Sequence, residues 1–340
     1  MPALLIALLL ALAASAPAAG ATPEIHAHRG GPLVDGQPAQ PEDAQPAFEF
    51  GHSIGADVIE LDAKLSAEGI PYVIHDATLD RTTDCAGQVR QKTAAELANC
   101  HVDTIGTDSK ITQVPGAQVP VPRLSDVLAW VKAQKALINL EIKNQPGDPD
   151  FDGSPAFARA VLAAVEASTI PKDRVLIQSF YPPNLDEAKA QGYRTSYLSL
   201  AATNPGAIDF AASRDYDVLS PEWPVSNNPS SYVQRAHDAG LLVVPYTFEE
   251  ADEVRAALDA GVDGVIVNDV PVAQRVIYGA DCPTARSREA AQRTALAKAR
   301  ARRVAARGKA WTAANAAVKR VNAQRQAAKR LRLRVCTPGV

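Results

Sequence analysis

The chain has 340 residues, which is enough for one large α/β domain or two medium ones. Its hydrophobic fraction of 46% and charged fraction of 21% are typical of a globular protein and exclude a wholly disordered chain. The net charge of −3 hides an uneven distribution, because residues 284–335 carry +15 and the remainder carries −18.

The first 21 residues predict a secretion signal. An apolar run from Leu4 to Ala14 precedes Ala19-Gly20-Ala21, which resembles a signal-peptide cleavage site. No lysine or arginine precedes the run, which departs from the usual signal. An uncleaved membrane anchor is the alternative, but the run is shorter than the about 20 residues that span a bilayer. We expect residues 1–21 to be removed and the protein to be secreted to the cell envelope or the exterior.

Residues 22–281 predict a single barrel. Short apolar runs alternate there with amphipathic stretches, as expected of repeated strand and helix units around a parallel sheet. Eight such units over about 250 residues predict a TIM (β/α)₈ barrel. The eight strand candidates are EIHAH, DVIEL, ALINLEI, RVLIQS, YRTSYLSL, YDVLS, LLVVPYT and DGVIVN.

One unit of the barrel is interrupted. Residues 76–123, after the second barrel strand, are rich in polar residues, glycine and proline and predict a small inserted subdomain. An oxidising compartment favours disulfides over metal thiolates, and four cysteines allow three pairings. Cys85 and Cys100 lie in this one segment, whereas Cys282 and Cys336 bracket the tail. We therefore expect the pairs Cys85–Cys100 and Cys282–Cys336.

The tail, residues 282–340, is rich in alanine, arginine, lysine and glutamine, with Gly308 as a break. This composition predicts two basic helices that form a hairpin. Two interpretations stay open. The tail is either a solvated appendage, or an arm that contacts an anionic membrane, a cell-wall polymer or nucleic acid. Specific nucleic-acid recognition is not expected.

Carboxylates are predicted to converge at the carboxyl end of the barrel. Glu60 and Asp62 share one strand face, and Glu141 and Lys143 repeat this spacing on the next barrel strand. Both faces of a barrel strand are covered, so solvent does not explain these polar residues. Three convergent carboxylates need a cation between them, and an all-oxygen cluster suits one Ca²⁺ or Mg²⁺ ion.

Cationic side chains and histidines accompany these acids. Arg29 and Lys143 are suited to hold a phosphate beside the metal. His28 and His75 end two strand candidates and could face each other as general acid and base. This combination predicts phosphoester cleavage. His26 shares a strand face with His28 and is not excluded as a ligand by spacing, but we expect it to be packed and hydrogen-bonded.

Six blocks occur in a fixed order between residues 25 and 279, and together they resemble the glycerophosphodiester phosphodiesterase family, in its secreted bacterial form. HRG alone would carry no weight, whereas the combination is specific. The blocks are HRG (28–30), PEDAQPAF (41–48), GADVIELDAKLSAEGIPYVIHDATLDRTTD (55–84), LEIK (140–143), QSF (178–180) and GVDGVIVNDVP (261–271).

The resemblance implies a TIM barrel with a small insertion, a divalent metal, and hydrolysis of glycerophosphodiesters to glycerol 3-phosphate and an alcohol. It also implies a role for each matching residue. His28 and His75 correspond to the acid and base, Arg29 and Lys143 to phosphate contacts, Glu60, Asp62 and Glu141 to metal ligands, and Glu42, Gln178 and Tyr246 to additional active-site positions.

Several positions depart from the family pattern. The loop from Gly31 to Gln40 is longer than usual, Asp43 stands where asparagine is common, and Tyr246 and Glu249 replace tryptophan and asparagine. These positions are expected to line the alcohol or glycerol side of the pocket, so the substrate is less defined than the reaction.

Two alternatives remain at the level of sequence. One is a phospholipase D of the sphingomyelinase D type, which shares the two-histidine, metal-carboxylate barrel but acts on intact lipid. The long segment between His75 and Leu124 favours the glycerophosphodiesterase. The basic tail favours the phospholipase D. The other alternative is a non-catalytic barrel that binds a surface through its tail, which the complete set of histidines and acids disfavours.

Overall fold

The computed structural model describes residues 22–102, 119–200 and 204–282, with a few positions of the C-terminal segment. The predicted secretion signal, part of the predicted insertion and most of the basic tail lie outside the described residues. The C-terminal positions described are 285–287, 290, 291, 294, 298, 328, 329, 331, 332 and 334–336.

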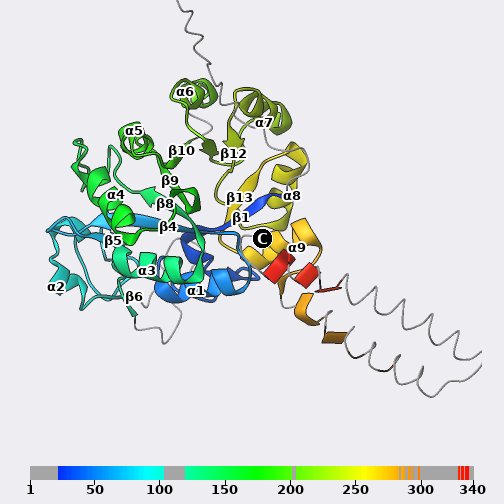
Figure 1. Ribbon diagram of the computed structural model, residues 1–340, viewed down its shortest axis with the longest axis horizontal. Helices are drawn as coiled ribbons and strands as arrows, with labels where there is room; N and C mark the ends of the chain where they lie inside the picture. The colour runs from blue at the N-terminus through cyan, green and yellow to red at the C-terminus, as the bar shows by residue number, and fades with distance from the viewer. Residues whose placement is uncertain are drawn as a thin grey trace, which may run out of the picture.

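Eight parallel strands form the barrel (Figure 1), and they are the eight that the sequence predicts. Seven strand-to-strand pairings follow the order β12-β11-β10-β9-β8-β4-β1-β13. The ring closes through backbone bonds from Asp263 N–H to the Val243 carbonyl (2.9 Å) and from Ile266 N–H to the Pro245 carbonyl (3.0 Å). The barrel strands are β1 (Glu24–Ala27), β4 (Val58–Leu65), β8 (Leu137–Ile142), β9 (Val175–Ser179), β10 (Arg194–Ser199), β11 (Val218–Pro221), β12 (Leu242–Val243) and β13 (Gly264–Val267).

A helix follows each barrel strand and packs outside the barrel (Figure 1). In the helix after β8, Phe157, Val161 and Val165 recur every four residues and are all buried, whereas Glu166 is exposed. This spacing places one apolar face on the sheet. The helices are α1 (Gln45–Ser53), α3 (Leu124–Gln134), α4 (Ala156–Ser168), α5 (Pro182–Ala190), α6 (Ala207–Ser213), α7 (Pro229–Asp238), α8 (Ala251–Ala260) and α9 (Val270–Tyr278).

The two faces of β4 differ in chemistry although every residue of the strand is buried. Ile59 and Leu61 belong to the main apolar core between strands and helices. The alternate residues Glu60, Asp62 and Lys64 therefore occupy the other face, toward the barrel interior. The sequence suggested that Glu60 and Asp62 lie at the end of their strand. β4 continues to Leu65, however, so both residues lie within it.

The chain between β4 and α3 leaves the barrel and builds its own small core. It begins with β5 (Pro71–Val73), which pairs antiparallel with the end of β4, so the excursion starts before residue 76. A separate apolar cluster that includes Tyr72, Leu79 and Leu97 holds it together. His75 consequently follows an antiparallel strand and not a barrel strand. The remaining short elements of this excursion are η2 (Val89–Gln91), α2 (Ala94–Leu97), β6 (His101–Val102) and β7 (Val119–Pro120).

Both cysteine pairs have geometry that suits a disulfide. The Cα atoms of Cys85 and Cys100 are 5.4 Å apart, and those of Cys282 and Cys336 are 5.0 Å apart. Near the second pair, the Gln274 amide of α9 donates to the Val335 carbonyl (2.9 Å), so this part of the C-terminal segment returns to the barrel (Figure 1). Among the described residues, no helix is both long and apolar enough to cross a membrane.

The loop after β1 is shaped by a tight turn. It contains η1 (His28–Gly30) and a ribbon of β2 (Leu33–Val34) and β3 (Gln37–Pro38) within the unusually long segment that follows. Gly30 has φ of +89°, and a Cβ at this position would lie 2.6 Å from the Ala47 Cβ and 2.8 Å from the Ala47 carbonyl carbon. Only glycine allows α1 to approach the turn this closely.

Replacing Gly30 with alanine is expected to destabilise the fold by at least about 2 kcal/mol, because the left-handed backbone and the clash with α1 both oppose a side chain. Gly36→Ala is the matched control, since Gly36 has φ of +70° but no atom lies within 4 Å of the place that its Cβ would take. Urea unfolding followed by tryptophan fluorescence measures both. Equal losses in the two variants would contradict the packing role of Gly30.

Candidate active site

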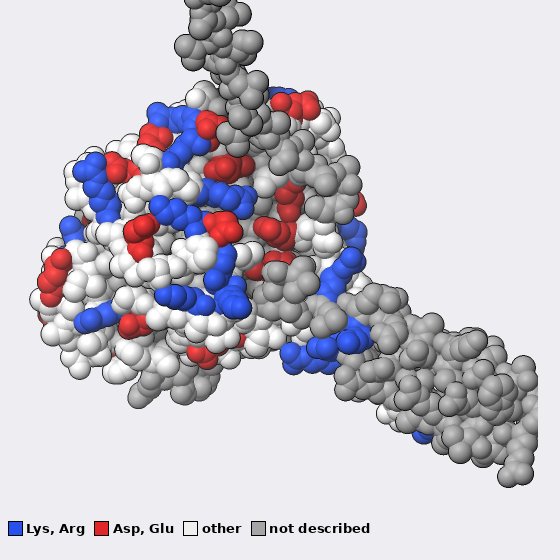
Figure 2. Space-filling view, in the orientation of Figure 1, with Lys and Arg blue, Asp and Glu red and all other residues white. Residues whose placement is uncertain are grey.

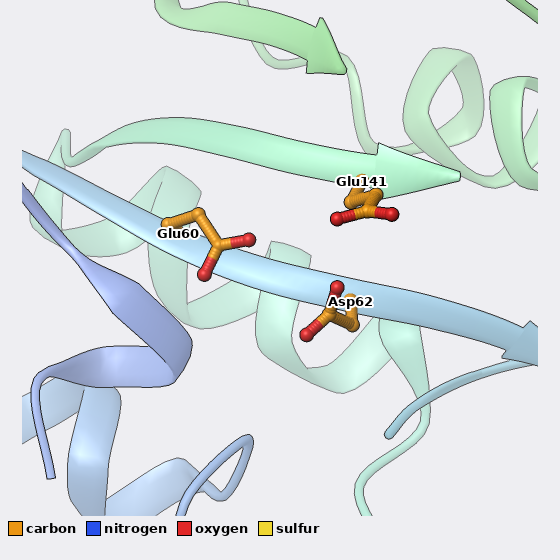
Figure 3. Close-up of side chains that lie close together, drawn as sticks. All are labelled: Glu60, Asp62 and Glu141. Carbon is orange, nitrogen blue, oxygen red and sulfur yellow. The ribbon is translucent and has the colours of Figure 1, made fainter. Parts of the chain in front are cut away.

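Three buried carboxylates meet inside the carboxyl half of the barrel. Glu60 and Asp62 extend from β4 and Glu141 from neighbouring β8, and all three point into the same space (Figure 3). One oxygen from each lies within 4.8 Å of the others. The pairing of Asp62 with Glu141 in the β4–β8 register brings the two strands' acids together.

This cluster is unstable as a set of bare anions. Burial, followed by the charge of Asp62, raises the pKa of Glu60. Burial also raises the pKa of Glu141 to about 7, although the Lys143 ammonium opposes the shift. Both oxygens of Asp62 lack a hydrogen-bond partner among the described residues. Oxygen ligands that are buried, convergent and partly unpartnered fit one hard divalent cation.

Two cationic side chains border the carboxylates. The Lys143 ammonium lies 3.0 Å from Glu141 Oε1 and 5.7 Å from the centre of the Phe180 ring. Arg29 donates its backbone N–H to Glu60 Oε2 (2.7 Å), and its Nε lies 3.5 Å from Asp62 Oδ2. The structure thus places both predicted phosphate-binding residues beside the acid cluster.

The two predicted catalytic histidines line the same cavity, of about 140 Å³. His28 Nδ1 lies 2.7 Å from Asn268 Oδ1, and His75 Nδ1 lies 2.7 Å from Asp76 Oδ1. Each ring therefore has its Nδ1 occupied and its Nε2 available. Burial and then the Arg29 guanidinium lower the pKa of His28 to about 3 and lower that of His75 as well, so both imidazoles are neutral near pH 7.

An ion-pair network behind the cavity was not predicted from the sequence. Arg81 Nε donates to Asp76 Oδ2 (2.5 Å), and its two terminal nitrogens donate to Glu42 at 2.6 and 3.0 Å. Glu42 also accepts from Arg29 Nη1 (2.8 Å). Glu42 thus lies between two guanidinium groups and outside the three-carboxylate cluster. The TLDRTTD block contained Arg81, but no local pattern linked it to Glu42, which lies 39 residues earlier.

Gln178 and Tyr246 have different places around the cavity. Gln178 Nε2 donates to Glu60 Oε1 (2.8 Å), and its own Oε1 accepts from buried Asn139 (2.7 Å). Gln178 therefore orients a carboxylate of the cluster. Tyr246 lines the cavity and packs edge-on against Phe180, with ring centres 5.9 Å apart.

Two residues expected at the alcohol side of the pocket lie elsewhere. Asp43 is buried behind the cluster, where its Oδ1 accepts from the Asp62 backbone N–H (3.2 Å). Glu249 accepts from Asn268 Nδ2 (3.1 Å) and is not among the residues that line the cavity. The expectation was wrong for both, because Asp43, in the turn before α1, faces the backbone of Asp62, and Glu249, between β12 and α8, faces Asn268.

His26 belongs to the opposite end of the barrel. It lines a larger cavity, of about 530 Å³, with residues from the amino ends of the strands, such as Leu137 and Leu242. Its ring is buried, and Nε2 lies 3.2 Å from Glu24 Oε2. This environment agrees with the expected packing role. The larger cavity contains none of the predicted catalytic residues, so cavity size does not mark the chemistry.

Comparison with known proteins gives a consistent result. A family model described as the Glycerophosphoryl diester phosphodiesterase family matches residues 28–272. The uncharacterized protein YqiK of Bacillus subtilis strain 168 is 30% identical over 250 residues, which cover 72% of this chain and 94% of that protein. A glycerophosphodiester phosphodiesterase of Caldanaerobacter subterraneus is 28% identical over 232 residues, or 67% of this chain and 89% of that protein.

Solved structures share the fold. A chain from Silicibacter pomeroyi DSS-3, provisionally named as a glycerophosphoryl diester phosphodiesterase, has a TM-score of 0.66 and 25% identity, and the match covers 76% of this chain and 94% of that one. An Oleispira antarctica phosphodiesterase, solved with sn-glycerol-3-phosphate, has a TM-score of 0.59 and 22% identity, with coverage of 75% and 95%.

The Glu42 network predicts a pH-dependent contribution to stability. Burial raises the pKa of Glu42, but Arg29 and Arg81 outweigh it and lower the value to about 2. Because this folded-state pKa lies below the unfolded value of about 4.3, the carboxylate stabilises the fold by on the order of 3 kcal/mol above pH about 4.3. That contribution disappears as the pH falls from there to about 2.

Glu42→Gln should therefore lower the free energy of unfolding at pH 7, and its difference from the native protein should shrink from pH 5 to pH 3. Urea unfolding at several pH values measures this. Glu49→Gln is the control, because Glu49 is an exposed residue of the adjacent helix α1. A difference that stays constant down to pH 3 would refute the ion-pair account.

Proposed function

Because the chain belongs to the glycerophosphoryl diester phosphodiesterase family, we propose that it hydrolyses glycerophosphodiesters to sn-glycerol 3-phosphate and an alcohol. Membership of this family makes it an enzyme, a phosphoric diester hydrolase, which rules out the non-catalytic barrel. Curated relatives that carry the name glycerophosphodiester phosphodiesterase support the substrate class.

The observation that carries the proposal is the composition of one small cavity. Acids, cations and two histidines converge there, as cleavage of a phosphodiester requires. The anionic phosphate needs positive charge, the nucleophile needs a base, and the leaving oxygen needs a proton. The side chains that supply these functions are Glu60, Asp62, Glu141, Arg29, Lys143, His28 and His75.

Glu60, Asp62 and Glu141 are the residues that would hold one divalent cation, Ca²⁺ or Mg²⁺. Such an ion supplies charge neutralisation at a phosphoryl oxygen when bound. Arg29 and Lys143 add fixed positive charge for the remaining phosphate oxygens. Arg29 is held in place by Glu42, which leaves little reorganisation to occur when the substrate binds.

The histidines handle the protons. With Nδ1 of His28 bonded to Asn268 and Nδ1 of His75 bonded to Asp76, both rings present Nε2 to the substrate. One imidazole takes the proton of the attacking hydroxyl group at Nε2. The other must first take up a proton at Nε2, which it then gives to the departing alkoxide. The attacking group is water or the neighbouring glycerol hydroxyl.

A lipid phosphodiesterase of the phospholipase D or sphingomyelinase D type is the second candidate. The observation in its favour is the tail, whose charge of +15 suits an anionic surface, whereas basic and acidic side chains are interspersed over the face of the barrel in Figure 2. The folded excursion between β4 and α3, which has its own core, supports the diesterase instead.

We further propose that residues 1–21 direct secretion, after which the basic tail holds the enzyme near an anionic membrane or cell-wall polymer. The apolar N-terminal run and the two cysteine pairs support export.

Glycerophosphocholine, incubated with the purified enzyme and Ca²⁺ or Mg²⁺, is expected to yield sn-glycerol 3-phosphate and choline, and a chelator should abolish the activity until one of the ions is restored. His28→Ala and His75→Ala are each expected to lower kcat by about 10²- to 10⁴-fold, because each removes a proton-transfer group.

His52→Ala is the control, since His52 packs edge-on against Trp130 of α3 outside the cavity. Coupled detection of sn-glycerol 3-phosphate measures every variant. Choline release from sphingomyelin or lysophosphatidylcholine, with no glycerol 3-phosphate from any glycerophosphodiester, would replace the first proposal with the lipid enzyme. Full activity in His28→Ala would exclude the two-histidine mechanism.

A further inference from the structure

A relay of three side chains joins Glu249 to the catalytic histidine His28. Glu249 lies between β12 and α8, Asn268 follows β13, and His28 follows β1. Asn268 Nδ2 lies 3.1 Å from Glu249 Oε1, and Asn268 Oδ1 lies 2.7 Å from His28 Nδ1. Only the histidine lines the cavity, so Glu249 and Asn268 reach the substrate through it.

Hydrogen-bonding chemistry gives the relay one direction. An ionised carboxylate accepts hydrogen bonds and donates none, so the end of the Asn268 amide that faces Glu249 must be its NH₂ group. The amide oxygen then faces His28 and needs a donor. His28 Nδ1 must therefore carry the ring proton, and Nε2 keeps its lone pair for the reaction.

The backbone and burial prevent Asn268 from escaping this arrangement. Its N–H donates to the Phe248 carbonyl (3.1 Å), and its carbonyl accepts from Leu33 N–H (3.1 Å). Only 6% of Asn268 is exposed, so water does not compete for its amide. Backbone and packing hold the amide in place, but they do not distinguish its oxygen from its NH₂ group. That distinction falls to Glu249.

We propose that Glu249 is a positioning residue that fixes the orientation of the Asn268 amide and thereby the Nδ1–H tautomer of His28. The proposal rests on the proposed function in one respect, because it assigns His28 Nε2 as a proton-transfer atom. If the amide turned over, its NH₂ group would face Nδ1, the proton would move to Nε2, and that nitrogen would no longer accept one.

The test changes which side chain, at position 249 or at position 268, donates the hydrogen bond between them. Glu249→Gln keeps the shape of the side chain but allows it to donate or accept, so both amide orientations become available. The double variant Glu249→Gln/Asn268→Asp restores a single direction, because the new glutamine donates to the new carboxylate, which accepts from His28 Nδ1–H. Glu250→Gln, the same change at the neighbouring exposed residue, is the control.

Long-range ¹H–¹⁵N correlation spectra of the full chain, labelled at histidine and loaded with Mg²⁺, report the His28 tautomer without substrate. The native protein, the Glu250→Gln control and the double variant should show Nδ1–H alone. Glu249→Gln should show a mixture, and its kcat should fall by the same factor as the Nδ1–H population, about twofold if the orientations become equal.

An unchanged Nδ1–H tautomer in Glu249→Gln would overturn the proposal, as would a double variant that leaves the mixture in place. Failure of the proposed function would look different. The native enzyme would then release no glycerol 3-phosphate, whereas the spectra would still report which nitrogen of His28 carries the proton. Tryptophan fluorescence confirms that each variant is folded. If Glu249→Gln unfolds, Glu249→Leu replaces it, and the same mixture of tautomers is expected.

Discussion

The mutual repulsion of three buried carboxylates is the constraint around which the site is organised. Glu60, Asp62 and Glu141 project from adjacent strands into one space with little solvent. Burial and proximity raise the pKa of Glu60 and Glu141, so the cluster would bind protons if nothing else neutralised it. A divalent cation is the simplest answer to this arrangement, and it is also what a phosphoryl group needs beside it.

The surroundings are arranged in layers of alternating charge. Arg29 and Lys143 border the acids, Glu42 holds Arg29 from behind, and Arg81 joins Glu42 to Asp76. Asp76 in turn orients His75, so the folded excursion between β4 and α3 positions one of the two histidines proposed to transfer protons. The excursion thus completes the site that the barrel begins.

The sequence predicted the parts of the site that depend on local pattern. Polar residues that alternate with apolar ones in a fully buried strand have few explanations besides function, which is why Glu60, Asp62 and Glu141 were identifiable. The eight strands were also recognisable from local pattern, since each is a short apolar run between helical stretches. Family resemblance then assigned roles that pattern alone left open.

Other parts depend on contacts between distant residues, which no local pattern encodes. Asn268 and His28 are separated by 240 positions, and in the proposed relay the direction of their hydrogen bond depends on Glu249. Glu249 and Asp43 stood out as departures from the family pattern, but their positions outside the cavity depend on how the loops that carry them pack against distant residues. His75 likewise required the antiparallel pairing of β5, which the periodicity of YVIH does not distinguish from a barrel strand.

The central claim is that the three carboxylates hold one divalent cation. Isothermal titration of the metal-free protein with Ca²⁺ or Mg²⁺ tests it directly, with Glu141→Gln as the variant that removes one ligand charge. The account predicts one ion bound per chain and a marked loss of affinity in Glu141→Gln. Binding of neither ion, or equal affinity in the native protein and the variant, would contradict it.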